Sequence, residues 1–94
     1  MGTSYGLIEI PSTTAAIDVV DIMCKTADVE FVTWEKKLGG RLVTIIVRGT
    51  ISAVTEAVEA ASAHAIKEPV AKAVIANPHD EILKIVNQSA SRLH

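Results

Sequence analysis

The feature that most constrains the fold of this chain is a pair of adjacent glycines between two strand-forming segments. The stretch Lys37-Leu38-Gly39-Gly40-Arg41 precedes a β-branched, apolar run at Leu42–Gly49. Adjacent glycines permit positive backbone φ angles and leave the backbone free of side chains. The pattern predicts an antiparallel hairpin with its turn at the glycines. An ordinary hairpin turn is the simpler interpretation, and a turn that approaches a ligand or a symmetry-related copy is the alternative.

Strand and helix patterns alternate along the rest of the chain. Strands are predicted at residues 5–10, 29–36, 42–48 and 70–76, and helices at 14–27, 51–66 and 81–86. Ser12, Thr50 and the segment Asn77-Pro78-His79-Asp80 mark the helix starts. The order predicts an α+β fold, a ferredoxin-like βαββαβ arrangement with a short C-terminal helix, an antiparallel sheet and helices on one face. Residues 1–94 are expected to form one domain, with a core over about 5–86 and a polar tail at 87–94.

Apolar periodicity predicts which side of each long helix is buried. In the first helix the expected inward residues are Ala16, Ile17, Val20, Cys24 and Ala27, so the lone cysteine is expected in the core. In the second helix they are Val54, Ala57, Val58, Ala61 and Ala65, while Glu56 and Glu59 face solvent.

Composition argues against several classes of protein. The net charge of −2 and only three aromatic residues are unfavourable for nucleic-acid binding. No run of 18 apolar residues and no signal-peptide pattern occurs, and one cysteine rules out an internal disulfide, so a cytoplasmic protein outside the membrane is expected. Hydrophobic residues make up 49% of the chain, many of them Ala, Val and Ile. Such a small, apolar chain predicts a homo-oligomer.

The sequence offers no recognisable catalytic constellation. His64, His79 and His94 are not spaced as metal ligands, either with one another or with Cys24. Neither a nucleophile motif nor a phosphate-binding loop of the GxxxxGK type occurs. We therefore expect no enzyme, no catalytic residues, no metal and no cofactor.

Five segments, in order and spacing, carry a resemblance to a known family. They are Gly6-Leu7-Ile8-Glu9, Met23-Cys24-Lys25, Leu38-Gly39-Gly40, the run Leu42–Gly49, and Val74-Ile75-Ala76-Asn77-Pro78-His79. Together they resemble the single-domain, hexameric shell proteins of bacterial microcompartments, over residues 5–85.

The resemblance implies a structural, self-assembling protein rather than an enzyme. Six copies would form a disc, and discs would tile, with other shell proteins, into a shell that encloses enzymes in the bacterial cytoplasm. Leu38, Gly39, Gly40 and Arg41 would line a central pore through which small polar metabolites pass. The resemblance also assigns Lys25, Asn77 and His79 to the edge between neighbouring discs.

Three positions depart from the common family pattern. Asn77 stands where the family commonly has an arginine, so one edge contact is expected to be missing. Arg41 stands where the family often has a third glycine. If its side chain points at the six-fold axis, the pore would be anion-selective or partly closed. If it pairs with Glu35 or another acid, its role would be structural. The segment 34–37 is one residue longer than usual, which predicts a flipped strand register or a bulge.

A second class of function remains open from the residues alone. A ferredoxin-like oligomeric regulator could sense a small metabolite through the Gly39-Gly40 loop. A sensor would be a small closed oligomer, whereas a shell protein would form hexamers that continue into sheets or tubes.

Overall fold

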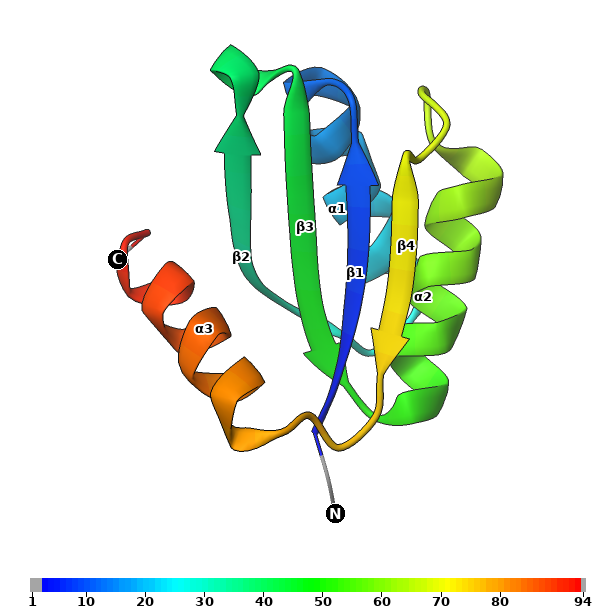
Figure 1. Ribbon diagram of the computed structural model, residues 1–94. Helices are drawn as coiled ribbons and strands as arrows, with labels where there is room; N and C mark the ends of the chain where they lie inside the picture. Colours follow the sequence, from blue (N-terminus) through cyan, green and yellow to red (C-terminus); the bar gives the residue numbers. More distant parts are fainter. Residues whose placement is uncertain (1–2, 94) are drawn as a thin grey trace.

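A computed structural model describes residues 3–93 of the chain (Figure 1). The elements, in chain order, are β1 (Ser4–Ile10), α1 (Thr13–Thr26), β2 (Glu30–Lys37), a single 3₁₀ turn η1 (Leu38–Gly40), β3 (Leu42–Gly49), α2 (Ile51–His64), β4 (Ala71–Ile75) and α3 (Asp80–Ser91). Both long helices begin where the sequence predicts. The Ser12 side chain accepts a hydrogen bond from the Ala15 N–H, and the Thr50 side chain accepts one from the Ala53 N–H.

The four strands form one antiparallel sheet in the order β2-β3-β1-β4. β1 lies in the middle and pairs with β3 on one side and β4 on the other. β2 and β3 form the predicted hairpin, closed by η1. This order confirms the α+β, ferredoxin-like arrangement. It leaves β2 and β4 as the two edges of the sheet.

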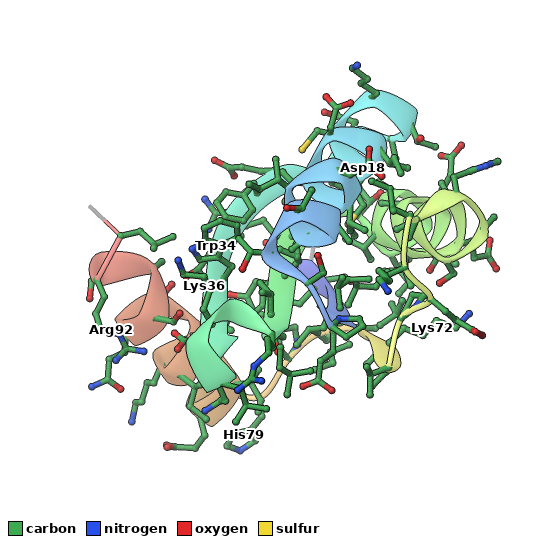
Figure 2. All side chains as sticks on the ribbon, turned by 90° about the horizontal axis from the view of Figure 1, so that it is seen from above. Asp18, Trp34, Lys36, Lys72, His79 and Arg92 are labelled. Atoms are coloured by element: carbon green, nitrogen blue, oxygen red, sulfur yellow. The ribbon has the colours of Figure 1, made fainter. Side chains whose placement is uncertain are left out.

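The helices are distributed over both faces of the sheet. α1 and α2 cover one face, as predicted, while α3 lies against β2 on the opposite face (Figures 1 and 2). α3 also runs to Ser91 instead of ending at Val86, so most of the predicted polar tail is helical. The expectation of helices on one face therefore holds for the two long helices and not for α3.

The main core lies between the sheet and the two long helices. Its largest members are Ile8, Ile10, Val19, Met23, Val43, Ile45, Val47 and Val54. β1 and α2 approach each other closely at Gly6, where an added Cβ would lie 2.9 Å from a Val58 methyl. The inward face of α2 agrees with the prediction, since Val54, Ala57, Val58 and Ala61 are buried and Ala65 packs against the core.

The buried face of α1 differs from the prediction. The residues that enter the core are Ala15, Ala16, Val19 and Met23, while Ile17 is 58% exposed and Cys24 is exposed. α1 carries two neighbouring apolar stripes, and periodicity alone does not show which one faces the sheet. The prediction of a core cysteine is therefore wrong, and the second stripe remains at the surface.

The sequence predicts a flipped register or a bulge near the hairpin, and the structure contains a bulge. Phe31 is opposite Val47 and Thr33 is opposite Ile46, so Val32 is the extra residue. The irregularity lies before the predicted segment 34–37, and the register is regular from Thr33 to the turn.

The bulge determines what α3 can contact. It turns two consecutive residues, Val32 and Thr33, to the same face of the sheet. Val32 joins a small apolar cluster with Val86 of α3, and Thr33 Oγ1 lies 2.8 Å from Ser89 Oγ. A regular strand would present only one of these two residues to α3.

Candidate functional site

The turn at the end of the β2–β3 hairpin has the backbone conformation that its glycines predict. Gly39 has a φ of 67° and Gly40 a φ of 89°, and Leu38 adopts a φ of 56° although it is not a glycine. The Leu38 side chain is 65% exposed at the tip. A non-glycine residue with positive φ is uncommon, because its Cβ crowds the backbone. The tip thus has a positive φ at three consecutive residues, and the conformation is uncommon only at Leu38.

A hydrogen bond from α1 holds this turn in place. Thr13 Oγ1 donates to the Gly40 carbonyl oxygen at 2.8 Å, although the two residues are 27 positions apart. A Cβ on Gly40 would lie 2.6 Å from that hydroxyl, whereas a Cβ on Gly39 would meet no atom within 4 Å. The second glycine is therefore required both by its φ and by the close approach of Thr13, a contact that the sequence analysis missed.

Arg41 folds back over the turn. Its Nε donates to the Leu38 carbonyl oxygen at 3.1 Å, and its backbone N–H donates to the same oxygen at 3.3 Å. Of the two alternatives for Arg41, the pairing with Glu35 does not occur in the single chain, where Glu35 is bound by Ser89 and Arg92. The Arg41 side chain is exposed at the tip.

The three predicted edge residues lie at the opposite end of the sheet from the hairpin (Figure 1). Lys25 is in the last turn of α1 and forms an ion pair of 2.9 Å with Asp21. Asn77 follows β4 with a φ of 49°. His79 Nδ1 accepts a hydrogen bond of 3.0 Å from the Glu81 N–H and so caps α3.

The structure thus groups the predicted site residues into two sets. The candidate pore residues are at one end of the sheet, and the candidate edge residues are at the other end, Lys25 on α1 and Asn77 and His79 between β4 and α3. Each set also has a local role within the chain, as a turn, a helix-end cation or a helix cap.

An apolar groove beside the β2 edge was not predicted. It has a volume of about 510 Å³ and is lined mainly by Ile17, Val20, Cys24, Phe31, Trp34 and Leu93. Phe31 and Trp34 contact each other edge to face, with ring centroids 6.4 Å apart, and the Lys36 ammonium lies 5.3 Å from the Trp34 ring centroid. The signal in the sequence was the second apolar stripe of α1.

A second apolar surface lies at the other edge of the sheet, along β4 and the segment that leads into it. Ile66 is 66% exposed, Val70 60% and Val74 36%. We call these three residues the β4 patch, and the groove described above the α1/β2 groove. The two surfaces consist of different residues and lie at opposite edges of the sheet, with β3 and β1 between β2 and β4.

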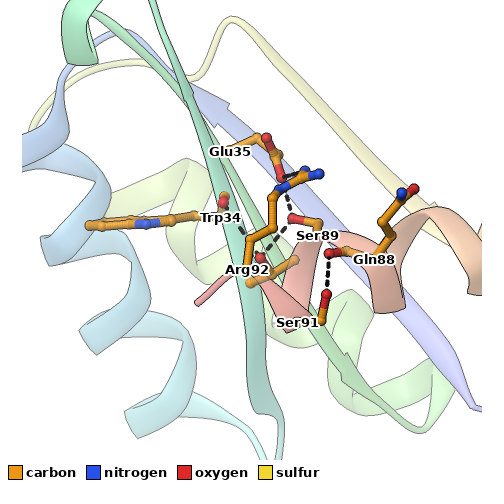
Figure 3. A network of polar contacts seen from close by, with 7 residues as sticks. Trp34, Glu35, Gln88, Ser89, Ser91 and Arg92 are labelled. Atoms are coloured by element: carbon orange, nitrogen blue, oxygen red, sulfur yellow. Dashed lines mark hydrogen bonds and ion pairs between the residues drawn. The ribbon is translucent and has the colours of Figure 1, made fainter. Parts of the chain in front are cut away.

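Polar side chains attach the end of α3 to β2 (Figure 3). The Ser89 hydroxyl donates a very short hydrogen bond to the Glu35 carboxylate, and Arg92 Nη2 donates to the same oxygen at 2.7 Å. A serine hydroxyl has one hydrogen to donate, and Ser89 donates it to Glu35. In the contact between Thr33 Oγ1 and Ser89 Oγ, Thr33 is therefore the donor. The Ser89 hydrogen bond and then the Arg92 guanidinium hold the pKa of Glu35 below its usual value. Trp34 extends from the other side of β2 toward α1 (Figure 3).

Residues 3–93 contain neither a membrane-spanning helix nor a cluster of metal-binding side chains. None of the helices described there is long and apolar enough to cross a membrane. Among the same residues, no group of three or more His, Cys, Asp or Glu side chains is arranged to hold a metal ion. His94, which the sequence analysis considered as a ligand, lies outside the described residues.

Comparison with known proteins identifies the family. The family model described as the BMC domain matches residues 4–78. The chain is 42% identical over 91 residues to the bacterial microcompartment shell protein PduA of Salmonella typhimurium, covering 95% of this chain and 96% of that protein. It is 39% identical over 98 aligned positions to the carboxysome shell protein CsoS1C of Hydrogenovibrio crunogenus, covering 97% of this chain and 94% of that protein.

A solved structure shows the same fold. The crystal structure of a microcompartments protein from Desulfitobacterium hafniense DCB matches 95% of this chain with a TM-score of 0.80 and 24% identity. This chain spans about half of that longer chain, 49% of its length. The family-model match covers most of this chain, and the shell-protein relatives are similar along nearly their whole length. The chain therefore belongs to the BMC-domain family of bacterial microcompartment shell proteins.

Proposed function

We propose that six copies of this chain form a disc with the hairpin turns at its axis, and that discs join edge to edge in a microcompartment shell. The family supports a structural shell role. The single observation that carries the ring is the pair of different apolar surfaces, the α1/β2 groove and the β4 patch, at opposite edges of one sheet.

Two different surfaces at opposite edges favour a ring over a two-fold dimer. When the β4 patch of one copy fills the α1/β2 groove of the next, the pair still has one free groove and one free patch, on different copies. Head-to-tail contacts of this type repeat until the rotation closes. Ile17, Trp34 and Val74 would then leave water, which is favourable by about 25 cal/mol for each Å² of apolar area that is buried.

The two ends of the molecule have matching roles in this ring. The hairpin tip would meet its five symmetry mates at the axis, so Leu38, Gly39, Gly40 and Arg41 would surround a pore for small polar metabolites. Lys25, Asn77 and His79 lie at the opposite end of the sheet and would reach the perimeter, where the next disc begins. The partners would then be other copies, other shell proteins and the enclosed enzymes.

Sedimentation of a matched pair of variants tests the ring. Ile17→Asp puts a charge into the α1/β2 groove, and Ile85→Asp makes the same change on α3, where Ile85 is 62% exposed and belongs to neither surface. We expect Ile17→Asp to shift the protein from hexamers to monomers, and Ile85→Asp to sediment like the wild type. The single tryptophan, Trp34, lies in the groove and should become more exposed only in the first variant.

Either of two results would contradict the proposed ring. One is a wild-type protein that sediments as a dimer or trimer. The other is an Ile17→Asp variant that remains hexameric, since the α1/β2 groove would then lie outside the contact. Far-ultraviolet circular dichroism on each variant separates loss of assembly from loss of fold.

A further inference from the structure

The pairing of the strands indicates which side chains of neighbouring copies would meet in the proposed ring. We infer that Lys72 of one copy packs against the Trp34 ring of the next copy, with Val74 beside Phe31. This inference rests on the proposed ring and adds the register of its contact.

Directly paired residues form rows that cross the whole sheet. One row begins at Trp34 of β2, passes through Ile45 and Ile8, and ends at Lys72 of β4. Paired residues point to the same face of a sheet, and Ile8 and Ile45 belong to the main core. Trp34 and Lys72 therefore point to the face that carries α1 and α2, at opposite edges of the sheet (Figure 2).

A second row has the same form. It begins at Phe31 of β2, passes through Val47 and Gly6, and ends at Val74 of β4. Phe31 lines the α1/β2 groove, and Val74 belongs to the β4 patch. Each row therefore joins a residue of the groove to a residue at the β4 edge.

Rotation about an axis at the hairpin tips would bring the two ends of a row together. A rotation keeps every residue at its own distance from the axis, and residues of one row lie at about the same distance from the tip. In neighbouring copies, Lys72 would therefore be level with Trp34, and Val74 with Phe31. Strands β2 and β4 would meet in antiparallel directions, because β2 runs toward the tip and β4 runs away from it (Figure 1).

The chemistry of the first of these pairs is complementary. Lys72 is exposed and takes part in none of the ion pairs found within residues 3–93. Trp34 lines the groove, and the Lys36 ammonium of the same chain lies 5.3 Å from its ring centroid. An indole ring attracts an ammonium group, and the attraction grows when water is excluded. The aliphatic stem of Lys72 would cover apolar surface of the groove at the same time.

Carboxylates near the contact offset the repulsion between its cations. Lys36 and Lys72 would share one indole ring, and each copy supplies one acid nearby. Asp21 lines the groove, where its carboxylate also pairs with Lys25, and Glu68 lines a cavity of about 300 Å³ together with Lys72. The contact would thus contain charges of both signs.

Disulfide trapping tests this register. In a Cys24→Ser background, Trp34→Cys/Lys72→Cys places one thiol at each edge of the sheet. Within one chain the two positions are three strand spacings apart, about 14 Å. A disulfide requires Cα atoms within roughly 7 Å, so any bond must join two copies. After oxidation we expect linked chains, up to six, on a denaturing gel without reductant.

A pair offset by one row is the matched control. Phe31→Cys/Lys72→Cys, in the same Cys24→Ser background, should form far fewer linked chains than Trp34→Cys/Lys72→Cys. Sedimentation of both variants before oxidation shows whether they are hexameric.

A second measurement keeps the groove intact. Lys72→Met removes the charge and keeps the length of the side chain, and Lys84→Met makes the same change on α3, where the side chain is 73% exposed. We expect Lys72→Met to raise the protomer concentration at which hexamers dissociate by about tenfold, and Lys84→Met to behave like the wild type. In a Trp34→Leu background, Lys72→Met should have a much smaller effect, because the ring is gone.

The outcomes distinguish this register from the ring on which it rests. Hexamers that link equally well, or better, through Phe31→Cys/Lys72→Cys would overturn the register and leave the ring intact. An effect of Lys72→Met that is absent, or equal with and without Trp34, would overturn it too, and this comparison decides if the cysteine variants do not assemble. A wild-type protein that sediments as monomers or dimers would instead contradict the proposed ring.

Discussion

At the scale of single residues, the hairpin turn shows what the sequence could and could not predict. The positive φ angles at Gly39 and Gly40 followed from residue type, because few other residues tolerate them. The hydrogen bond from Thr13 could not be predicted, since it joins residues 27 positions apart. Cys24 was misplaced for a related reason: both stripes of α1 are apolar, and only the packed fold decides which is buried.

The two glycines should respond differently to alanine. Both Gly39→Ala and Gly40→Ala place a Cβ at positive φ, at a cost of roughly 1–2 kcal/mol. Gly40→Ala should lose more of the free energy of unfolding, because its Cβ would lie 2.6 Å from Thr13 Oγ1. Urea denaturation at one fixed protomer concentration measures both changes.

A double variant tests the cause of this difference. Thr13→Ala removes the crowding oxygen, so Thr13→Ala/Gly40→Ala should be less destabilised than the sum of the two single variants. Strict additivity, with equal losses at the two glycines, would show that Thr13 does not restrict Gly40.

At the scale of elements, the strands and long helices were predictable because their signals are local. Alternation of apolar residues, the caps at Ser12 and Thr50, and the glycine turn each act within a few positions. The extent of α3 was not predictable, because residues 87–91 are mostly polar. They remain helical where Ser89 bonds to Thr33 and Glu35 across the sheet, contacts that depend on the bulge at Val32.

The attachment of α3 should weaken in acid. The pKa of Glu35 is lowered, first by the Ser89 hydrogen bond and then by Arg92. A lowered pKa in the folded state means that the stabilisation is present above the usual glutamate pKa of 4.5 and is lost as the pH falls through the folded-state value. Hydrogen exchange of the α3 amides, corrected for the intrinsic rate at each pH, should therefore accelerate below pH 4.5.

Two glutamine variants show whether Glu35 causes this change. Glu35→Gln should abolish the extra acid sensitivity of α3. Glu30→Gln is the matched control, because Glu30 also has a lowered pKa, owing to its hydrogen bond with Arg48, yet does not contact α3. Acid sensitivity that persists in Glu35→Gln would assign it to another group.

At the scale of the whole molecule, the order of elements predicted the fold, and the resemblance placed the chain in its family. The surfaces that would join copies were beyond prediction, since they consist of residues that the packed chain leaves outside its core. Ile17 and Trp34 beside β2, and Ile66, Val70 and Val74 beside β4, are recognisable as candidate contacts only once the edges of the sheet are known.

Electron microscopy of the purified wild-type protein tests the central claim most directly. Two-dimensional class averages should show discs with six-fold symmetry and a central depression, which at higher concentration join edge to edge into sheets or tubes. Discrete dimers or trimers, with no six-fold class at any concentration, would contradict the proposed ring and the pore and edge roles that depend on it.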